Sequence, residues 1–308
     1  MSKTMLKGIH RRAVGISADN ELMAPDGFVV GGDGQPAIVS SGPNTVAVFD
    51  DFTESPVLQG VNDTGVGTVG TVNHHRGLYF RWIGTDTGND VKLQDTGGVN
   101  GIIRIGPVND GTQTPAGTNT SLVGRAANWK ANMGPGPNSG RLRFGARLTC
   151  PGNADSVWNV GSVFAGFADT GALGAGTMPI YDTGASDTGG IAAVSNAVGF
   201  LFGENAPVGI RGVSAKGGAA GRQTVTLLSS EPVVNKFYNW ELELTRGQSD
   251  TGGKVNFYID GVIKGSINSP VTTNEPLVPG IWVMASDTGA PSIDVDWIAV
   301  SGPRDTGR

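Results

Sequence analysis

Two alternating runs of residues meet at Asp260-Gly261, and this junction limits the fold more than any other stretch of the chain. A two-residue Asp-Gly link favours a type I′ turn, because both central residues of that turn need positive φ. The sequence therefore predicts a β-hairpin over residues 254–267. Val255, Phe257 and Ile259 alternate with polar residues, so one face of this hairpin is expected to pack on a core.

The same alternation recurs along the chain between clusters of turn residues. It is clearest in residues 141–149, where apolar side chains face one way and Arg141, Arg143 and Arg147 face the other. No window shows the 3.6-residue apolar period of an amphipathic helix. The chain is therefore predicted to be all-β, an antiparallel sandwich. Further strands are expected at 46–52, 78–83, 102–105, 156–167, 198–202, 208–213, 223–228, 238–245, 277–284 and 292–300.

The chain divides by composition into a terminal arm (1–45), a sandwich (46–302) and a short C-terminal tail (303–308). The arm is rich in Gly, Pro and Asp and buries little apolar surface. Two interpretations stay open: a loose, solvated terminus, or an extended arm that becomes ordered on a partner. The candidate contacts of such an arm are its basic and apolar residues Lys3, Lys7, Arg11, Arg12, Phe28 and Val29.

The net charge, the cysteine count and the length of the apolar runs disfavour several classes of protein. A net charge of −5 and a pI near 5.2 argue against a dedicated nucleic-acid-binding protein, which usually carries a basic surface. The single cysteine, Cys150, cannot form an internal disulfide, and its place at a strand end favours a small buried thiol. No apolar run reaches the roughly 18 residues that span a bilayer, so neither a membrane anchor nor a signal peptide is expected.

The tripeptide Asp-Thr-Gly, which is the catalytic signature of aspartic proteases, occurs nine times. A protease would use two copies, each on an apolar-flanked loop, to share one proton between two carboxyl groups. Asp can bond to its own downstream backbone and Gly supplies positive φ, so a repeated turn explains every copy. We therefore interpret the tripeptide as a turn.

Two carboxylate pairs, Glu241 with Glu243 and Asp294 with Asp296, would have to flank a cleft in a glycoside hydrolase. Each pair lies on one face of one predicted strand, an arrangement more typical of a solvated face. The prediction is that the protein is not an enzyme and has no cofactor. A structural Ca²⁺ stays open, because the Asp-rich loop 85–90 offers several oxygen ligands.

The tryptophans and the arginine row each have two interpretations. Trp240, Trp282 and Trp297 lie in strongly apolar strands and are expected in the core, whereas Trp129 and Trp158 have polar surroundings and are candidates for stacking on a glycan. The row Arg141, Arg143 and Arg147 either keeps one sheet face soluble or docks on an acidic partner surface.

Motifs of the C-terminal half carry a resemblance to concanavalin A-like (laminin-G-like) jelly rolls. They are Phe257-Tyr-Ile-Asp-Gly-Val-Ile-Lys-Gly265, Pro279-Gly-Ile-Trp-Val283 and Asp294-Val-Asp-Trp-Ile-Ala-Val300. Phe49-Asp-Asp-Phe52 resembles the opening strand of that fold. The resemblance implies an antiparallel jelly-roll β-sandwich. The catalytic residues of sandwich glucanases and the metal-ligand loop of the lectins have no recognisable counterpart.

The order of four motifs along the chain also resembles that in structural proteins of tailed-bacteriophage virions. The quoted motifs are Gly27-Phe-Val-Val-Gly-Gly-Asp-Gly34, Val48-Phe-Asp-Asp-Phe52, Asn128-Trp-Lys-Ala-Asn132 and Asn196-Ala-Val-Gly-Phe-Leu-Phe202. This resemblance implies a capsid decoration protein, which would bind the major capsid protein or another virion protein through the arm and one sheet face. Such a protein would be a homo-oligomer on the capsid exterior and would be cytoplasmic in the host during assembly. The alternative is a lectin-like carbohydrate-binding module of a phage fibre or tail.

Overall fold

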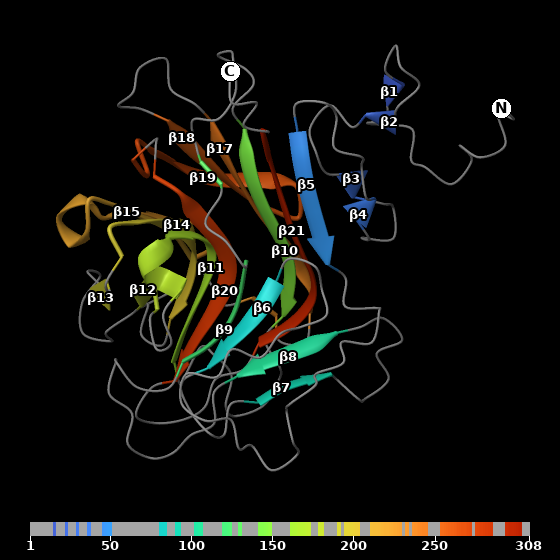
Figure 1. Cartoon of the computed structure of the whole chain (residues 1–308), viewed down its shortest axis with the longest axis horizontal. Coiled ribbons are helices and arrows are strands. Elements are labelled where there is room, and N and C mark those ends of the chain that lie inside the picture. Colours follow the sequence, from blue (N-terminus) through green and yellow to red (C-terminus); the bar gives the residue numbers. More distant parts are fainter. Residues whose placement is uncertain are drawn as a thin grey trace, which may run out of the picture.

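A computed structural model shows that the chain folds mainly into antiparallel β-sheets (Figure 1). The residues that the structure describes are 15–16, 22–23, 29–30, 36–37, 45–50, 80–84, 90–93, 102–106, 119–124, 129–130, 141–149, 161–173, 178–181, 190–191, 194–203, 210–229, 232–233, 236–245, 253–272, 275–285 and 293–303. They form two large antiparallel sheets, three two-stranded ribbons and two 3₁₀ turns.

The eight-stranded sheet has, in spatial order, β19 (Val262–Asn268), β18 (Lys254–Ile259), β17 (Tyr238–Thr245), β10 (Leu142–Thr149), β21 (Ile293–Pro303), β8 (Ile103–Gly106) and β7 (Asp90–Leu93), and β5 (Thr45–Asp50) also pairs with β21. The seven-stranded sheet has β16 (Gln223–Thr226), β15 (Arg211–Lys216), β14 (Asn196–Gly203), β11 (Gly161–Asp169), β20 (Leu277–Ala285), β9 (Asn119–Gly124) and β6 (Phe80–Gly84). Some neighbours are consecutive strands, such as β18 and β19, whereas others, such as β10 and β21, are far apart in sequence.

The small elements lie outside these sheets. The ribbons pair β1 (Gly15–Ile16) with β2 (Leu22–Met23), β3 (Val29–Val30) with β4 (Pro36–Ala37), and β12 (Ile180–Tyr181) with β13 (Gly190–Ile191). The turns are η1 (Thr170–Leu173) and η2 (Ala219–Gly221). The described residues thus contain no α-helix, as the missing helical period predicts.

The main core fills the space between the two sheets. Phe144 of β10 meets Phe167 of β11 at a ring-centroid distance of 5.9 Å, and Phe200 of β14 meets Phe257 of β18 at 5.3 Å, both edge to face. All four rings are fully buried. Truncating such a phenylalanine to alanine typically costs about 3–5 kcal/mol, so these cross-sheet contacts hold the sandwich together.

The predicted hairpin is confirmed. Asp260 has a φ of 49° and Gly261 a φ of 74°, which are the positive values that a type I′ turn needs at both central positions. The Asp260 carboxylate accepts a hydrogen bond from the Asn239 backbone N–H at 2.9 Å, which ties the turn to β17. The one described Asp-Thr-Gly copy, at Asp169, is also a turn, because its carboxylate accepts the backbone N–H of Gly171 at 3.0 Å.

The strand predictions differ from the structure at several places, including β15, which continues to Lys216 instead of ending at 213. β7 and β9 were not expected, since β7 has only four residues and β9 begins with the polar run Asn119-Thr-Ser121. Of the expected strand at 156–167, residues 161–167 belong to β11, which continues to Asp169, and residues 156–160 lie outside the described residues. Strand β17 matches its expected range of 238–245.

Candidate functional site

The arginine row of β10 lies on the outer face of the eight-stranded sheet, where carboxylates of neighbouring strands face it. Arg143 stands directly opposite Glu243 of β17 and donates a hydrogen bond to its carboxylate. Arg141 lies 3.7 Å from the same side chain, and Arg147 donates to Asp296 of β21. These guanidinium groups are therefore held within the chain's own sheet.

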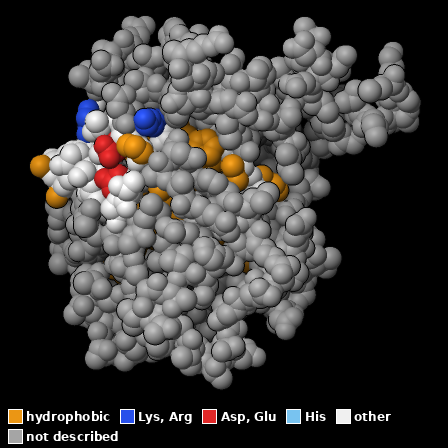
Figure 2. Space-filling model, viewed as in Figure 1, with side chains coloured by type: hydrophobic (Ala, Val, Ile, Leu, Met, Phe, Trp, Pro, Cys, Tyr) orange, Lys and Arg blue, Asp and Glu red, His pale blue; other side chains and the backbone are white. Residues whose placement is uncertain are grey.

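A further pair extends this ion-pair row to β8. Arg104 binds the Asp294 carboxylate through two nitrogens, at 2.7 and 3.0 Å. The charges thus alternate in sign across β17, β10, β21 and β8. Figure 2 shows basic and acidic side chains next to one another at one edge of the face in view. An acidic partner would have to compete with these internal carboxylates for the arginines.

Glu241 lies beside this row and has a different environment. Burial raises the pKa of its carboxyl group, the Arg143 guanidinium opposes this, and the nearby carboxylates of Asp260 and Glu243 add to it. Glu241 stands opposite Gly145 on β10 and Tyr258 on β18. A glycosidase needs one carboxyl group with a raised pKa and a second carboxyl group nearby. Glu241 and Glu243 are close together, but neither lines the pocket described below.

The outer face of the seven-stranded sheet is covered by the chain itself. A second apolar cluster lies there, in which Phe164 and Trp282 are in ring contact at 5.6 Å. Their rings lie over glycines, because a Cβ added to Gly199 would come within 2.7 Å of the Phe164 ring. The indole N–H of Trp282 donates to the Ala172 carbonyl of η1 at 3.3 Å. This face therefore offers no open groove at these residues.

The expected glycan-stacking residues do not form a platform. Trp129 is only 5% exposed, because its ring packs in the main core, and its backbone pairs with Leu277. The expectation that its side chain is exposed is therefore wrong. Trp158 lies outside the described residues, as do the arm residues Lys3, Lys7, Arg11, Arg12 and Phe28. Val29 belongs to β3, but only its backbone pairing with Ala37 is described.

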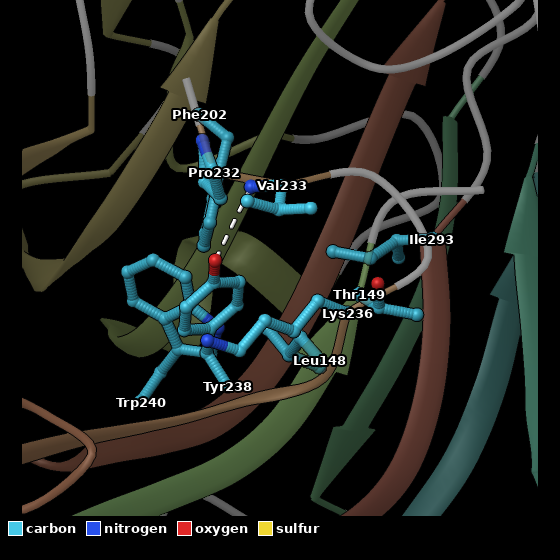
Figure 3. A pocket seen from close by; sticks show the side chains of 9 residues that line it. All are labelled: Leu148, Thr149, Phe202, Pro232, Val233, Lys236, Tyr238, Trp240 and Ile293. Carbon is cyan, nitrogen blue, oxygen red and sulfur yellow. Dashed lines mark hydrogen bonds between the residues drawn. The ribbon is translucent and has the colours of Figure 1, made fainter. Parts of the chain in front are cut away.

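A pocket opens at the end of the sandwich, where β10 and β14 end and β17 and β21 begin (Figure 3). About 10 Å³ of this end pocket is enclosed, and the rest of its roughly 230 Å³ is open to solvent. The enclosed space is about what one water molecule needs, so a ligand would lie across the mouth of the pocket and place one small group inside it. Its lining residues are Leu148, Thr149, Phe202, Pro232, Val233, Lys236, Tyr238, Trp240 and Ile293.

Aromatic residues and hydrogen-bond donors make up much of the end pocket. Trp240 is 1% exposed and contacts Phe202 at 5.0 Å and Tyr238 at 5.9 Å between ring centroids, and its indole Nε1 has no hydrogen-bond partner. The Tyr238 hydroxyl accepts the backbone N–H of Val233 at 3.2 Å. Figure 3 shows the Lys236 side chain extending towards Tyr238 and Trp240. Sequence reasoning missed this site, because its residues come from four separate segments.

Two further properties concern the described residues alone. They contain no group of three or more His, Cys, Asp and Glu side chains arranged to hold a metal ion. Most of the loop 85–90, where a structural Ca²⁺ was considered, lies outside them. Within the same part of the chain, no helix has the length and apolar character needed to cross a membrane.

The two stacked antiparallel sheets form a jelly-roll β-sandwich, which confirms the fold class expected from the sequence. The chain is similar in structure to the Emp46p carbohydrate recognition domain in its potassium-bound form, with a TM-score of 0.46, 11% identity, and coverage of 82% of this chain and 97% of that one. For peanut lectin the values are 0.43, 14%, 85% and 99%.

A β-glucanase is among the similar structures as well. The endo-1,3-β-glucanase from Streptomyces sioyaensis gives a TM-score of 0.42 and 13% identity, with 86% of this chain and 99% of that one covered. At these identities the likeness concerns the fold alone. No protein-family model matches the sequence, and neither does any curated protein. The bacteriophage resemblance stays a prediction.

Proposed function

We propose that this chain is a non-catalytic recognition module that binds carbohydrate through the end pocket. The observation that carries the proposal is the pairing of aromatic side chains with two donors, the exposed Lys236 ammonium and the Tyr238 hydroxyl. A sugar ring presents apolar C–H groups to an aromatic side chain and oxygen atoms to a donor.

The proposal of a module without catalysis is supported by the lining of the same pocket. Glycoside hydrolysis needs two carboxyl groups on either side of the bond that breaks. None of the described residues that line the end pocket is acidic. The glutamates on β17 are on the outer face of the sheet, where Glu243 pairs with Arg143. The pocket therefore supports recognition and supplies no acid–base pair.

A glycan array with the full chain tests the proposal, with Lys236→Ala as the probe variant. Lys236 is exposed, so its loss should leave the fold intact, while saturable binding to the array should fall clearly. Lys254→Ala is the matched control, because Lys254 is an exposed lysine of β18 that does not line the pocket. Thermal unfolding confirms that both variants fold.

Two results would overturn the proposal. One is an array on which the folded wild-type chain binds no glycan. The other is undiminished binding by Lys236→Ala, which would move the site away from the end pocket.

A further inference from the structure

The polar side chains of the end pocket are mainly donors. The Trp240 indole can only donate, and its N–H is unsatisfied. The Tyr238 oxygen already accepts the Val233 amide at 3.2 Å, so the hydroxyl is left to donate its own hydrogen. The Lys236 ammonium carries three donors and no acceptor. Thr149, the remaining polar side chain of the lining, is buried.

The pocket also carries an uncompensated positive charge. Lys236 is the charged residue among the described lining, and its ammonium lies 4.6 Å from the centroid of the Tyr238 ring. No carboxylate of the described residues pairs with it. This distinguishes Lys236 from Arg143 and Arg147, which are held by Glu243 and Asp296. A cation–π contact leaves the charge of the ammonium in place.

From this donor set we propose that the end pocket selects sugars that carry a carboxylate, such as a uronic acid. The inference rests on the proposed carbohydrate binding and names its ligand class. A carboxylate accepts hydrogen bonds through both oxygens and has the charge opposite to that of Lys236. A neutral sugar hydroxyl can accept from the Tyr238 hydroxyl but leaves the ammonium without its counter-charge.

The preference is measurable with three small probes on the full chain labelled with ¹⁵N. Methyl glucuronide, methyl glucoside and acetate are titrated, and the indole N–H signal of Trp240 is followed, after its assignment with Trp240→Phe. A hydrogen bond to a charged group contributes about 1.5–3 kcal/mol, so the glucuronide is expected to bind about tenfold or more tightly than the glucoside. Added salt should reduce that ratio.

The variant Lys236→Gln keeps the length of the side chain and removes its charge. It is expected to bind both methyl glycosides with similar affinity, whereas Lys254→Gln should keep the wild-type preference. A preference retained in Lys236→Gln would overturn the inference.

The remaining outcomes separate the two proposals. Equal affinity of the wild-type chain for glucuronide and glucoside overturns the acidic-sugar inference and leaves carbohydrate binding standing. Acetate that binds as tightly as the glucuronide also overturns it, because the sugar then contributes nothing. If neither glycoside shifts the Trp240 signal and the glycan array is blank, both proposals fail.

Discussion

At the scale of single residues, the outer face of the eight-stranded sheet shows how position changes the state of identical side chains. Glu243 lies between Arg141 and Arg143 and pairs with both. Glu241, two residues earlier on the same face, is partly buried near other carboxylates, and its pKa is raised. Ionisation of Glu241 at neutral pH therefore lowers stability.

The first prediction concerns Glu241→Gln. Burial raises the pKa of Glu241 above its ordinary value of 4.5, so the folded state binds this proton more tightly than the unfolded state. Stability is therefore lost as pH rises from about 4.5 through the raised pKa. Glutamine cannot ionise, so the variant should unfold at a higher temperature than the wild type at pH 7. The two melting temperatures should converge below about pH 4.5.

The control for this prediction is Glu243→Gln on the same strand. It leaves Arg143 without its carboxylate, and loss of a hydrogen bond between charged groups costs about 1.5–3 kcal/mol. This variant should be less stable than the wild type at pH 7. A melting temperature of Glu241→Gln at or below that of the wild type at pH 7 would contradict the account of Glu241.

At the scale of elements, β19 is the end strand of the eight-stranded sheet. Within the described sheet, one row of its backbone N–H and C=O groups has no partner strand, and Val262 and Ile263 are each 54% exposed. An exposed, apolar edge strand is a template for pairing with another chain. The homo-oligomer expected from the sequence stays a prediction, and β19 is the element on which to test it.

The second prediction is that Ile263→Lys weakens self-association. A charge on an edge strand opposes edge-to-edge pairing, so the variant should sediment closer to the monomer mass than the wild type at the same concentration. Val233→Lys is the control, because Val233 is 63% exposed but lies outside β19. A wild-type chain that sediments as a monomer at every protein concentration would argue against pairing through this edge.

At the scale of the whole molecule, strand β5 near the start of the sandwich lies beside β21, its last strand. Strand β5 begins at Thr45 and pairs with the last residues of β21, up to Pro303. The ribbons of the arm pair only with each other: β1 with β2, and β3 with β4. None of the described strands within residues 1–40 pairs with either large sheet.

The third prediction is that deleting residues 1–40 leaves the melting temperature of the sandwich unchanged, since no strand of either large sheet is removed. If the arm binds capsids, wild-type protein should co-sediment with undecorated phage capsids in stoichiometric amounts, and the truncated chain should not. Failure of both forms to bind would end the decoration-protein hypothesis. A lower melting temperature after truncation would show that the arm supports the sandwich.

Local patterns were enough to determine from sequence that the fold is an all-β sandwich. The turn at Asp260-Gly261, the alternation in residues 142–149 and the burial of Trp240 and Trp282 each depend on neighbours within a few positions. Propensity and period describe such neighbours directly. The outward direction of the arginines was also predictable, because alternation alone determines it.

Only the tertiary structure decided what those outward and buried groups meet. Arg143, Arg147 and Arg104 find carboxylates 100, 149 and 190 residues away in sequence. The end pocket joins β10, β14, the segment before β17 and the start of β21, and η1 covers a sheet face through Trp282. These contacts depend on the spatial order of the strands, and the periodicity of a single strand holds no information about which other strand will lie beside it.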